Sequence, residues 1–534
     1  MQLLGRSIIG SRRGADHGAA LSGLNPATGE RLEPAYSPAS LDEVNEAAEL
    51  AHDAFASYSQ VSGSDKAAFL RAIAREIEAI GDPLVARATA ETGLPAARIQ
   101  GETARTCFQL RLFAELVEEG SWIDARIDLP DPARQPLPKA DLRSMQRPLG
   151  PVVVFCASNF PLAFSVAGGD TASALAGGNP VIVKAHHAHP GTAELVGIAV
   201  EKAARECQLP EGVFSLLYGS GNEIGTALMT HPHIKAGGFT GSRSGGQALM
   251  RVAAARPEPI PFYAEMSSIN PVVILPGALT DRLDQIAVGL HASVTLGAGQ
   301  FCTNPGLVLL EEGASTAPFI ERFAGLMSGS APFTMLTPGI SDAYRRGVAS
   351  HAGSESVSTI VRQEGPTSSG GCQAGTALFQ TDAASFLANA ALSDEIFGPA
   401  TLFVTHSNRE QLLQIVRSLE GHLTATVLGS DEDLVENRDL IAILETRVGR
   451  LVFNGFPTGV EVCHSMVHGG PYPATSDGRS TSVGTRAIYR FTRAVCYQSF
   501  PQSSLPMELR NSNPLGILRM VDGQFTRESL SSGN

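Results

Sequence analysis

One cysteine of the chain lies in a glycine-rich stretch and could do chemistry. The segment "GQFCTNPG", residues 299–306, places Cys302 between a glycine lead-in and an Asn-Pro-Gly turn. The thiol could be a core residue, a disulfide partner, a metal ligand or a nucleophile. The seven cysteines are odd in number and widely spaced in a long chain, which disfavours a disulfide framework. Core thiol and nucleophile therefore remain as the two main interpretations.

A metal site is not expected from the histidine pattern. Histidines cluster in "HHAHP" (186–190) and "HPH" (231–233), and neither cluster has a cysteine or carboxylate pair at a zinc-binding spacing. We therefore predict that Cys302 binds no metal.

Four other loops carry groups that could act together with this thiol. They are "ASNFP" (157–161) with Asn159, "VKAHHAHPG" (183–191) with Lys184 and His187, "GGFTGSRSGG" (237–246) with Gly241 and Ser242, and "AEMSSINP" (264–271) with Glu265. Each loop alone also fits an ordinary turn, helix start or surface acid. The stretch "YGSGNEIG" (218–225) lacks the spacing of the G-x-G-x-x-G dinucleotide fingerprint.

Alternating short apolar runs and helical segments should position these loops. Residues 40–58 begin with a Ser-x-x-Glu capping box and continue with apolar residues at helical spacing, which predicts a helix. Two sets of strands are predicted, the first at 151–155, 181–184 and 213–217, the second at 271–275, 307–310, 423–428 and 451–453. This alternation favours βαβ units and parallel sheets, in which ligands bind at the carboxyl ends of the strands. Residues 366–376 are predicted to form a loop.

Composition narrows the class of protein further. The chain has 534 residues, which is enough for two or three domains, and a net charge of −13. This acidic balance disfavours a nucleic-acid partner, because nucleic-acid binding needs basic patches. No apolar run is long enough for a membrane span. The N-terminal stretch has no apolar core of signal-peptide length, so we expect a cytoplasmic protein.

Taken together and in this order, the loops resemble the aldehyde dehydrogenase superfamily. The resemblance runs from "LNPATGE" (24–30) through "EIFGP" (395–399) to about residue 500. The superfamily's Asn-Phe-Pro, Phe-Thr-Gly-Ser and Gly-Gln-x-Cys motifs occur here in sequence at suitable spacing. Residues 157–192, 299–308 and 453–477 are most similar to the branch that oxidises 2,5-dioxopentanoate (α-ketoglutaric semialdehyde).

The resemblance implies a role for each catalytic residue. Cys302 would attack the aldehyde, because a thiolate adds readily to a carbonyl carbon. Asn159 and the backbone N–H of Cys302 would stabilise the oxyanion. Glu265 would activate water to release the acid, a role on which coenzyme-A-acylating relatives do not rely. His464, in "EVCHSM", falls near the place where some NADP-preferring relatives put a histidine close to the thiol. A structural loop histidine is the alternative.

The resemblance also implies a nicotinamide cofactor. Lys184 would reach the adenosine ribose, Gly241 and Ser242 would lie near the pyrophosphate, and Glu395 and Phe397 would hold the nicotinamide ribose. NAD-preferring members commonly have a glutamate three residues after the lysine, where this chain has His187. A histidine does not repel a 2′-phosphate, and when protonated it attracts one. We therefore expect NADP to be preferred, with NAD as the alternative.

The implied fold is α/β, with two Rossmann-like parallel-sheet domains and a β-hairpin oligomerisation flap. The cofactor-binding domain would comprise 1–125 and 148–265, the catalytic domain 266–480, the flap 126–147 and 481–500, and a tail 501–534. The resemblance implies a homodimer or homotetramer. The tail could cover a neighbouring subunit or the substrate entrance. The expected substrate carries a carboxylate, for which Thr458 is a loop candidate. The alternatives are a broad-specificity or long-chain aldehyde dehydrogenase and a non-catalytic structural homologue.

Overall fold

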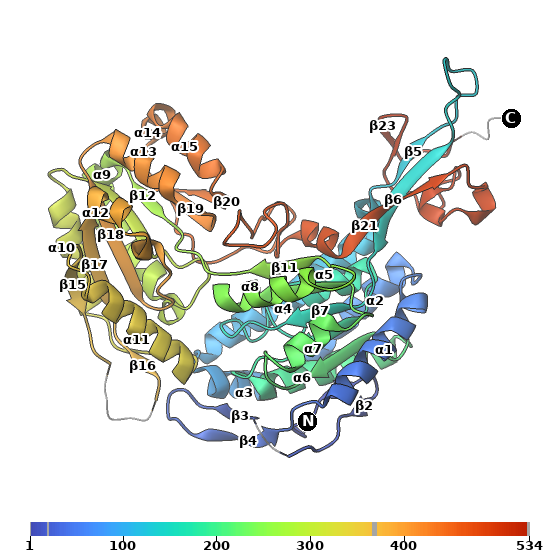
Figure 1. The fold of residues 1–534 in the computed structure, drawn as a ribbon, viewed down its shortest axis with the longest axis horizontal. Helices are drawn as coiled ribbons and strands as arrows, with labels where there is room; N and C mark the ends of the chain where they lie inside the picture. Colours follow the sequence, from blue (N-terminus) through green and yellow to red (C-terminus); the bar gives the residue numbers. More distant parts are fainter. Residues whose placement is uncertain (1, 19–20, 366–370, 531–534) are drawn as a thin grey trace.

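Two seven-stranded sheets and a five-stranded sheet that projects as an arm form the framework of the chain (Figure 1). The computed structural model describes residues 2–18, 21–365 and 371–530. Parts of the predicted loop 366–376 and of the tail 501–534 lie outside these ranges. Within them, no helix combines the length and the apolar character that a membrane crossing requires.

The first sheet is parallel at its centre, as the sequence predicts. Its order is β11-β10-β7-β8-β9-β1-β2, and the neighbours from β11 to β9 run parallel. The short N-terminal strands β1 and β2 extend it antiparallel. The strands are β1 (Ile8–Ile9), β2 (Arg12–Arg13), β7 (Val152–Phe155), β8 (Val181–Lys184), β9 (Phe214–Leu217), β10 (Ala236–Thr240) and β11 (Phe262–Glu265).

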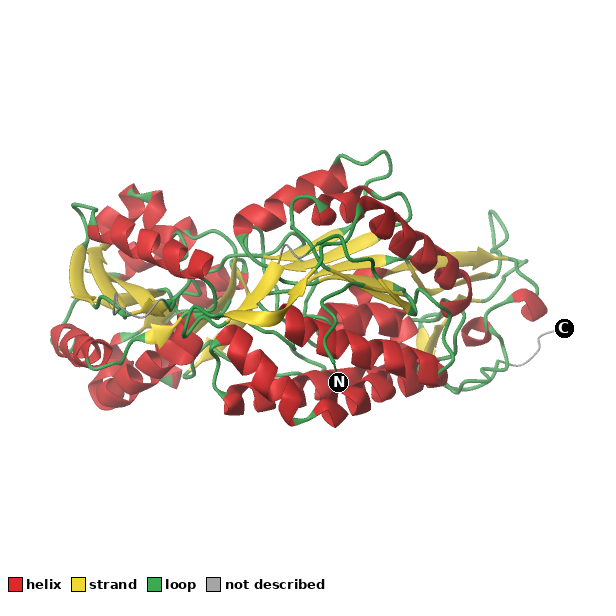
Figure 2. Ribbon diagram, turned by 90° about the horizontal axis from the view of Figure 1, so that it is seen from below, coloured by secondary structure: helices red, strands yellow, loops and turns green. Residues whose placement is uncertain are grey.

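Helices cover both faces of this sheet (Figure 2). The capping box of Ser40 and Glu43 is present at the start of the first helix, which confirms the predicted helix there. The helices are α1 (Leu41–Tyr58), α2 (Gly63–Ile80), α3 (Asp82–Thr92), α4 (Ala96–Glu119), α5 (Gly169–Gly177), α6 (Pro190–Glu206), α7 (Ile224–Thr230) and α8 (Arg243–Ala254). A two-stranded ribbon, β3 (Leu21–Leu24) with β4 (Arg31–Tyr36), precedes α1.

The second sheet repeats this architecture, and every strand predicted for it is present. Its order is β15-β17-β18-β13-β12-β19-β20, parallel except for the pair β15 and β17. The strands are β12 (Val272–Ile274), β13 (Leu307–Glu311), β15 (Ser358–Arg362), β17 (Ala377–Asp382), β18 (Ala400–His406), β19 (His422–Leu428) and β20 (Val448–Phe453). A two-stranded ribbon of β14 (Phe333–Thr334) and β16 (Gln373–Ala374) lies apart from it.

Helices also flank the second sheet. They are α9 (Pro276–Thr295), α10 (Thr316–Ser328), α11 (Pro338–Ala352), α12 (Ala383–Ala388), α13 (Arg409–Ser418), α14 (Asp431–Glu436) and α15 (Arg438–Glu445). The strands β12, β18 and β19 are buried along their whole length, as expected for a sheet covered on both faces. The α/β fold class is therefore confirmed.

The arm contains part of the C-terminal tail and strands from both predicted flap segments, whereas Thr485–Phe491 of the predicted flap form a 3₁₀ helix that packs into the core beside the first sheet. Its order is β21-β6-β5-β22-β23, with strands β5 (Arg126–Asp128), β6 (Leu142–Pro148), β21 (Thr492–Gln498), β22 (Arg519–Val521) and β23 (Gln524–Thr526). The last two strands belong to the tail, and β22 pairs parallel with β5. Buried Arg143 of β6 donates to the carbonyl of Leu509, which fixes the tail against the arm.

Candidate active site

The predicted site residues follow neighbouring strands of the first sheet. Lys184 is the last residue of β8, and Glu265 is the last residue of β11. Asn159 lies in the loop after β7, and Ser242 lies just after β10. These parallel strands end at one edge of the sheet, so their loops converge there, as the parallel topology predicts.

One groove collects most of the predicted residues. Cys302 and Glu265 line it, together with residues from the loops after β7, β8 and β10 and from the segment before β18. The predicted residues that line this groove are Asn159, His187, Gly241, Ser242, Glu265, Cys302, Glu395 and Phe397. Lys184 does not line it and is largely buried at the end of its strand.

The loop that carries Cys302 is held by close backbone approaches. The short 3₁₀ segment η2 (Leu296–Gly299) precedes it. Gly299 has a φ of +65°, and a Cβ there would lie 2.2 Å from the carbonyl oxygen of Gly398. Only glycine fits this position without displacement of the backbone. The glycine lead-in therefore positions the thiol.

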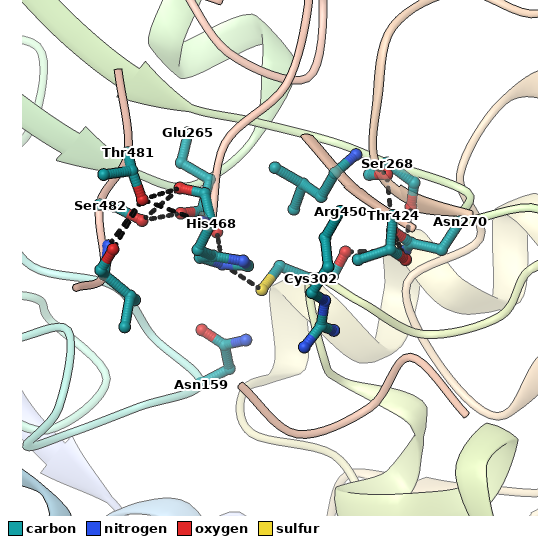
Figure 3. A network of polar contacts seen from close by, with 12 residues as sticks. Asn159, Glu265, Ser268, Asn270, Cys302, Thr424, Arg450, His468, Thr481 and Ser482 are labelled. Carbon is teal, nitrogen blue, oxygen red and sulfur yellow. Dashed lines mark hydrogen bonds and ion pairs between the residues drawn. The ribbon is translucent and has the colours of Figure 1, made fainter. Parts of the chain in front are cut away.

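Asn270 anchors the same loop from the opposite side (Figure 3). Its buried Nδ2 donates to the carbonyl oxygens of Cys302 at 2.8 Å and Asn304 at 2.9 Å. Its Oδ1 accepts from the hydroxyls of Ser268 and Thr424. No local pattern in the sequence points to Asn270, although it lies in the "AEMSSINP" loop that carries Glu265.

The thiol lies beside a histidine and a carboxylate (Figure 3). His468 Nε2 is 3.4 Å from Cys302 Sγ and 2.9 Å from Glu265 Oε1. Ser482 Oγ donates to Glu265 Oε2 at 2.8 Å. The backbone N–H of His468 donates to Thr481, so the histidine is held on its own loop. Glu265 and His468 are both buried, which strengthens the electrostatic contact between the three groups.

The histidine beside the thiol is not the predicted one. His464 is exposed, and its Nδ1 lies 3.4 Å from Thr485 Oγ1. The expectation of a histidine close to the thiol is met four positions later, by His468. The segment from 454 to 484 contains no helix or strand, so no periodicity in the sequence tells which of its histidines turns inward.

Burial and charge set the protonation of the pair. Burial, followed by the negative charge of Glu265, raises the pKa of the Cys302 thiol well above its usual value. Burial also opposes ionisation of Glu265, but the charge of His468 and the hydrogen bonds from His468, Ser482 and Cys302 outweigh it, so the pKa of Glu265 is lowered. At neutral pH the resting pair is thus a protonated thiol beside a carboxylate.

Asn159 provides an amide donor close to the thiol. Its Nδ2 donates one hydrogen to the carbonyl of Gln300 at 2.9 Å, which leaves the second hydrogen for a ligand. The Asn-Phe-Pro loop is itself braced by buried Glu102, whose Oε1 accepts from the backbone N–H groups of Leu162 and Ala163. Helix α4 therefore fixes the loop that presents the amide.

The rest of the groove fits a dinucleotide. Ser242 caps α8, and the N-terminus of a helix with its unpaired N–H groups attracts phosphate. A Cβ on Gly241 would lie 2.7 Å from the ring of Phe239, so a larger residue there would have to displace that ring. Burial raises the pKa of Glu395 to about 7, and its carboxyl can accept hydrogen bonds from ribose hydroxyls.

His187 lines the groove from the loop after β8 and is exposed. Desolvation, followed by the positive charge of Lys184, lowers the pKa of His187 from its usual value. Its imidazole is therefore neutral at neutral pH in the ligand-free protein. The attraction of a protonated imidazole for a 2′-phosphate then depends on the proton being taken up with the ligand.

The triad could also hold a metal ion. The ligand atoms of Glu265, Cys302 and His468 lie within 4.8 Å of one another. The prediction of no metal site considered only histidines adjacent in the sequence, so it could not weigh this group. We interpret the triad as acid–base machinery, because a nucleophilic sulfur needs a proton acceptor within reach.

The chain is similar in sequence and in fold to known proteins. The sequence profile described as "Aldehyde dehydrogenase family" matches residues 14–492. The chain is 53% identical to "Alpha-ketoglutaric semialdehyde dehydrogenase 2" of Azospirillum brasilense over 98% of this chain and 100% of the relative. It is 44% identical to "Alpha-ketoglutaric semialdehyde dehydrogenase" of Acinetobacter baylyi, over 98% and 99% of the two chains. Lactaldehyde dehydrogenase from Escherichia coli has the same fold, with a TM-score of 0.80 at 19% identity over 92% and 98% of the two chains.

Proposed function

The chain belongs to the aldehyde dehydrogenase family, and from that premise we propose that it oxidises 2,5-dioxopentanoate to 2-oxoglutarate with NAD(P)⁺. That it is an NAD(P)-dependent aldehyde dehydrogenase follows from the family and its relatives. The substrate rests on the names of the two relatives that align over nearly the whole chain. The observation that carries the chemistry is the contact of one histidine with both the thiol and the carboxylate.

The first step we propose is attack of the Cys302 sulfur on the aldehyde carbon. The thiol is protonated at rest, so its proton must leave as the carbon–sulfur bond forms. The Glu265 carboxylate lies within 4.8 Å of the sulfur and is placed to take that proton, while His468 Nε2 contacts both groups and holds them together. The product is a thiohemiacetal whose oxygen carries negative charge.

Asn159 and the backbone N–H of Cys302 would stabilise this oxyanion. Because Gln300 already fixes the Asn159 amide, little reorganisation is needed when the charge develops. Bound NAD(P)⁺ supplies the acceptor for the hydride that leaves the thiohemiacetal carbon. The residues we propose to hold it are Ser242 and Gly241 at the pyrophosphate, Glu395 and Phe397 at the nicotinamide ribose, and Lys184 and His187 at the adenosine ribose.

Hydrolysis of the remaining thioester would complete the reaction. After the proton from the first step has left Glu265 for the solvent, Glu265 would take a proton from water and the hydroxide would add to the acyl carbon. The carbon–sulfur bond would then break, and the departing thiolate would take the proton back from Glu265. One aldehyde, one water and one NAD(P)⁺ thus give one carboxylic acid, one NAD(P)H and one proton. Ser482 and His468 would hold the carboxylate in the orientation that this step needs.

An aldehyde panel with both cofactors tests the proposal. We expect the highest kcat/KM for 2,5-dioxopentanoate and a higher value with NADP⁺ than with NAD⁺. A Cys302→Ala variant should not reduce cofactor with any aldehyde. Preference for decanal would instead indicate a long-chain aldehyde dehydrogenase, and a large advantage of NAD⁺ would contradict the NADP preference.

We also propose that the arm joins copies of the chain. Members of the family are generally oligomeric, and the arm extends away from the rest of the molecule (Figure 1). Light scattering coupled to gel filtration would give the mass of the assembly. A monomer at micromolar concentration would contradict this proposal.

A further inference from the structure

Two arginines with unsatisfied donors lie near the thiol, outside the cofactor groove. Arg105 comes from α4, and Arg450 comes from β20. Neither lines the groove that holds Asn159 and Glu265. Figure 3 shows Arg450 beside Cys302.

Both guanidinium groups are charged neighbours of the thiol. The positive charge of Arg450 lowers the pKa of Cys302, although burial and Glu265 dominate in the opposite direction. Burial lowers the pKa of Arg105, which the negative charges of Glu102, Glu461 and an ionised Cys302 oppose. A carboxylate carried by the aldehyde that Cys302 attacks would therefore lie within the electrostatic field of both arginines.

One loop holds the two arginines in place. Arg450 donates to the carbonyls of Pro457 and Gly459, and Arg105 donates to the carbonyl of Val460. The guanidinium of Arg105 also lies over the ring of Phe164, 5.9 Å from its centroid. That ring is 6.0 Å from the His468 ring, centroid to centroid. Arg105 is thus linked to His468, the histidine beside the thiol, through the ring of Phe164.

The remaining donors have no protein partner. Among the residues that the structure describes, Nε and Nη2 of Arg105 and Nε of Arg450 are buried and without a hydrogen-bond partner. Burial of unsatisfied cationic donors is unfavourable, so a site that keeps them gains when an anion binds. A carboxylate is the planar acceptor that a guanidinium fits best.

We propose that Arg105 and Arg450 form the subsite for the distal carboxylate of the substrate. The inference rests on the proposed function, because it assumes an aldehyde that also carries a carboxylate. In 2,5-dioxopentanoate four bonds separate the aldehyde carbon from the carboxylate carbon, a reach of about 5 Å with C–C bonds of about 1.5 Å. Thr458, the loop candidate of the sequence analysis, instead shares a hydrogen bond with Ser293 at 2.6 Å.

The test compares a charged and an uncharged aldehyde of the same length. Arg450→Gln and Arg105→Gln should each lower kcat/KM for 2,5-dioxopentanoate by about ten- to hundredfold, the cost of one lost charge-assisted hydrogen bond. Pentanal lacks the carboxylate, so its kcat/KM should stay near the wild-type value. Arg447→Gln is the matched control, because Arg447 directly precedes β20 and its charge acts on His422 instead.

A second measurement, protection of Cys302 by glutarate, remains informative if a substitution displaces the loop at 457–460 that holds the two arginines. Glutarate should compete with the substrate in the wild type, and should slow alkylation of Cys302 by iodoacetamide. In each Gln variant the glutarate concentration needed for half protection should rise by about tenfold or more. Arg→Lys variants keep the charge but not the planar fork and should fall between wild type and Gln.

The outcomes separate the two proposals. If the wild type does not prefer 2,5-dioxopentanoate over pentanal, the proposed substrate is wrong and the subsite falls with it. If the wild type shows the preference and both Gln variants retain it together with glutarate protection, the subsite alone is wrong. Equal losses with both aldehydes and unchanged glutarate protection would also overturn the subsite.

Discussion

Replacement of Glu265 by glutamine should make Cys302 more reactive toward alkylation while it abolishes turnover. Glu265 is buried and its pKa is lowered, so it is a carboxylate at neutral pH. After burial, its charge is the largest cause that raises the pKa of the Cys302 thiol. Glutamine keeps the shape and removes the charge. A hydrogen bond from its amide would favour the thiolate further.

The size of the effect follows from the separation of the groups. The sulfur and the carboxylate oxygen are at most 4.8 Å apart. At an effective dielectric constant of about 20, two unit charges at this distance repel by about 3.5 kcal/mol, which corresponds to a thiol pKa lower by about 2.5. The thiolate fraction at neutral pH would then rise by about 300-fold. Because nucleophilicity falls with pKa, the net gain in alkylation rate is about 20-fold.

The assay is the rate of iodoacetamide labelling as a function of pH, read on the peptide that contains Cys302. The other buried thiols interfere little, since burial raises the pKa of Cys107 to about 12 and that of Cys156 to about 11. Ser482→Ala is the control, because it removes a hydrogen bond to Glu265 but keeps the charge. Its labelling midpoint should move far less. An unchanged or higher midpoint in Glu265→Gln would refute the electrostatic reasoning.

Three further predictions concern the histidines and the tail. A bound 2′-phosphate raises the pKa of His187, so NADP⁺ binding is favoured at low pH. The kcat/KM with NADP⁺ divided by the kcat/KM with NAD⁺ should therefore rise about three- to tenfold from pH 8 to pH 6. The same rise in His187→Gln would contradict this. His468→Gln should lower kcat by about 10²-fold, whereas His464→Gln should stay near wild type, and equal losses would remove the distinction. Deletion of 501–534 uncovers Met145 and removes one of the hydrogen-bond acceptors of Arg143, so Tm should fall by about 5 °C or more in a thermal melt. An unchanged Tm would show that the tail does not stabilise the arm.

Residues that lie in regular elements or their immediate loops could be placed from the sequence. Asn159 and Lys184 lie after and at the end of strands β7 and β8, whose apolar runs predict them, and parallel strands bring their ends together. Strands β10 (AGGFT) and β11 (FYAE) carry no such run, so Ser242 and Glu265 could be placed through the resemblance alone. The position of Cys302 could not be predicted from a strand pattern either, because its loop is defined by the close approach of Gly299 to Gly398, a contact between segments distant in the sequence.

The rest of the site depends on tertiary contacts that leave no local pattern. His468 and Ser482 lie in a segment without helix or strand, so their direction is set only by what they pack against. Arg105 lies on α4, and a charged residue in a helix is usually solvated, so its sequence gives no sign of a role at the site. Its position near the thiol follows from the docking of that helix against the loop of Val460.

The addition of the tail to the arm makes the two margins of that sheet unequal. One margin is β21, a seven-residue strand, and the other is β23, a three-residue strand of a terminal hairpin. Unpaired margins of long strands are templates for pairing with another chain, whereas short ones are poor templates. Such a sheet can pair with another chain at one edge and not at the other. This favours a closed pair of copies over an open-ended fibre. The tail would thus act as a terminator that limits growth of the assembly.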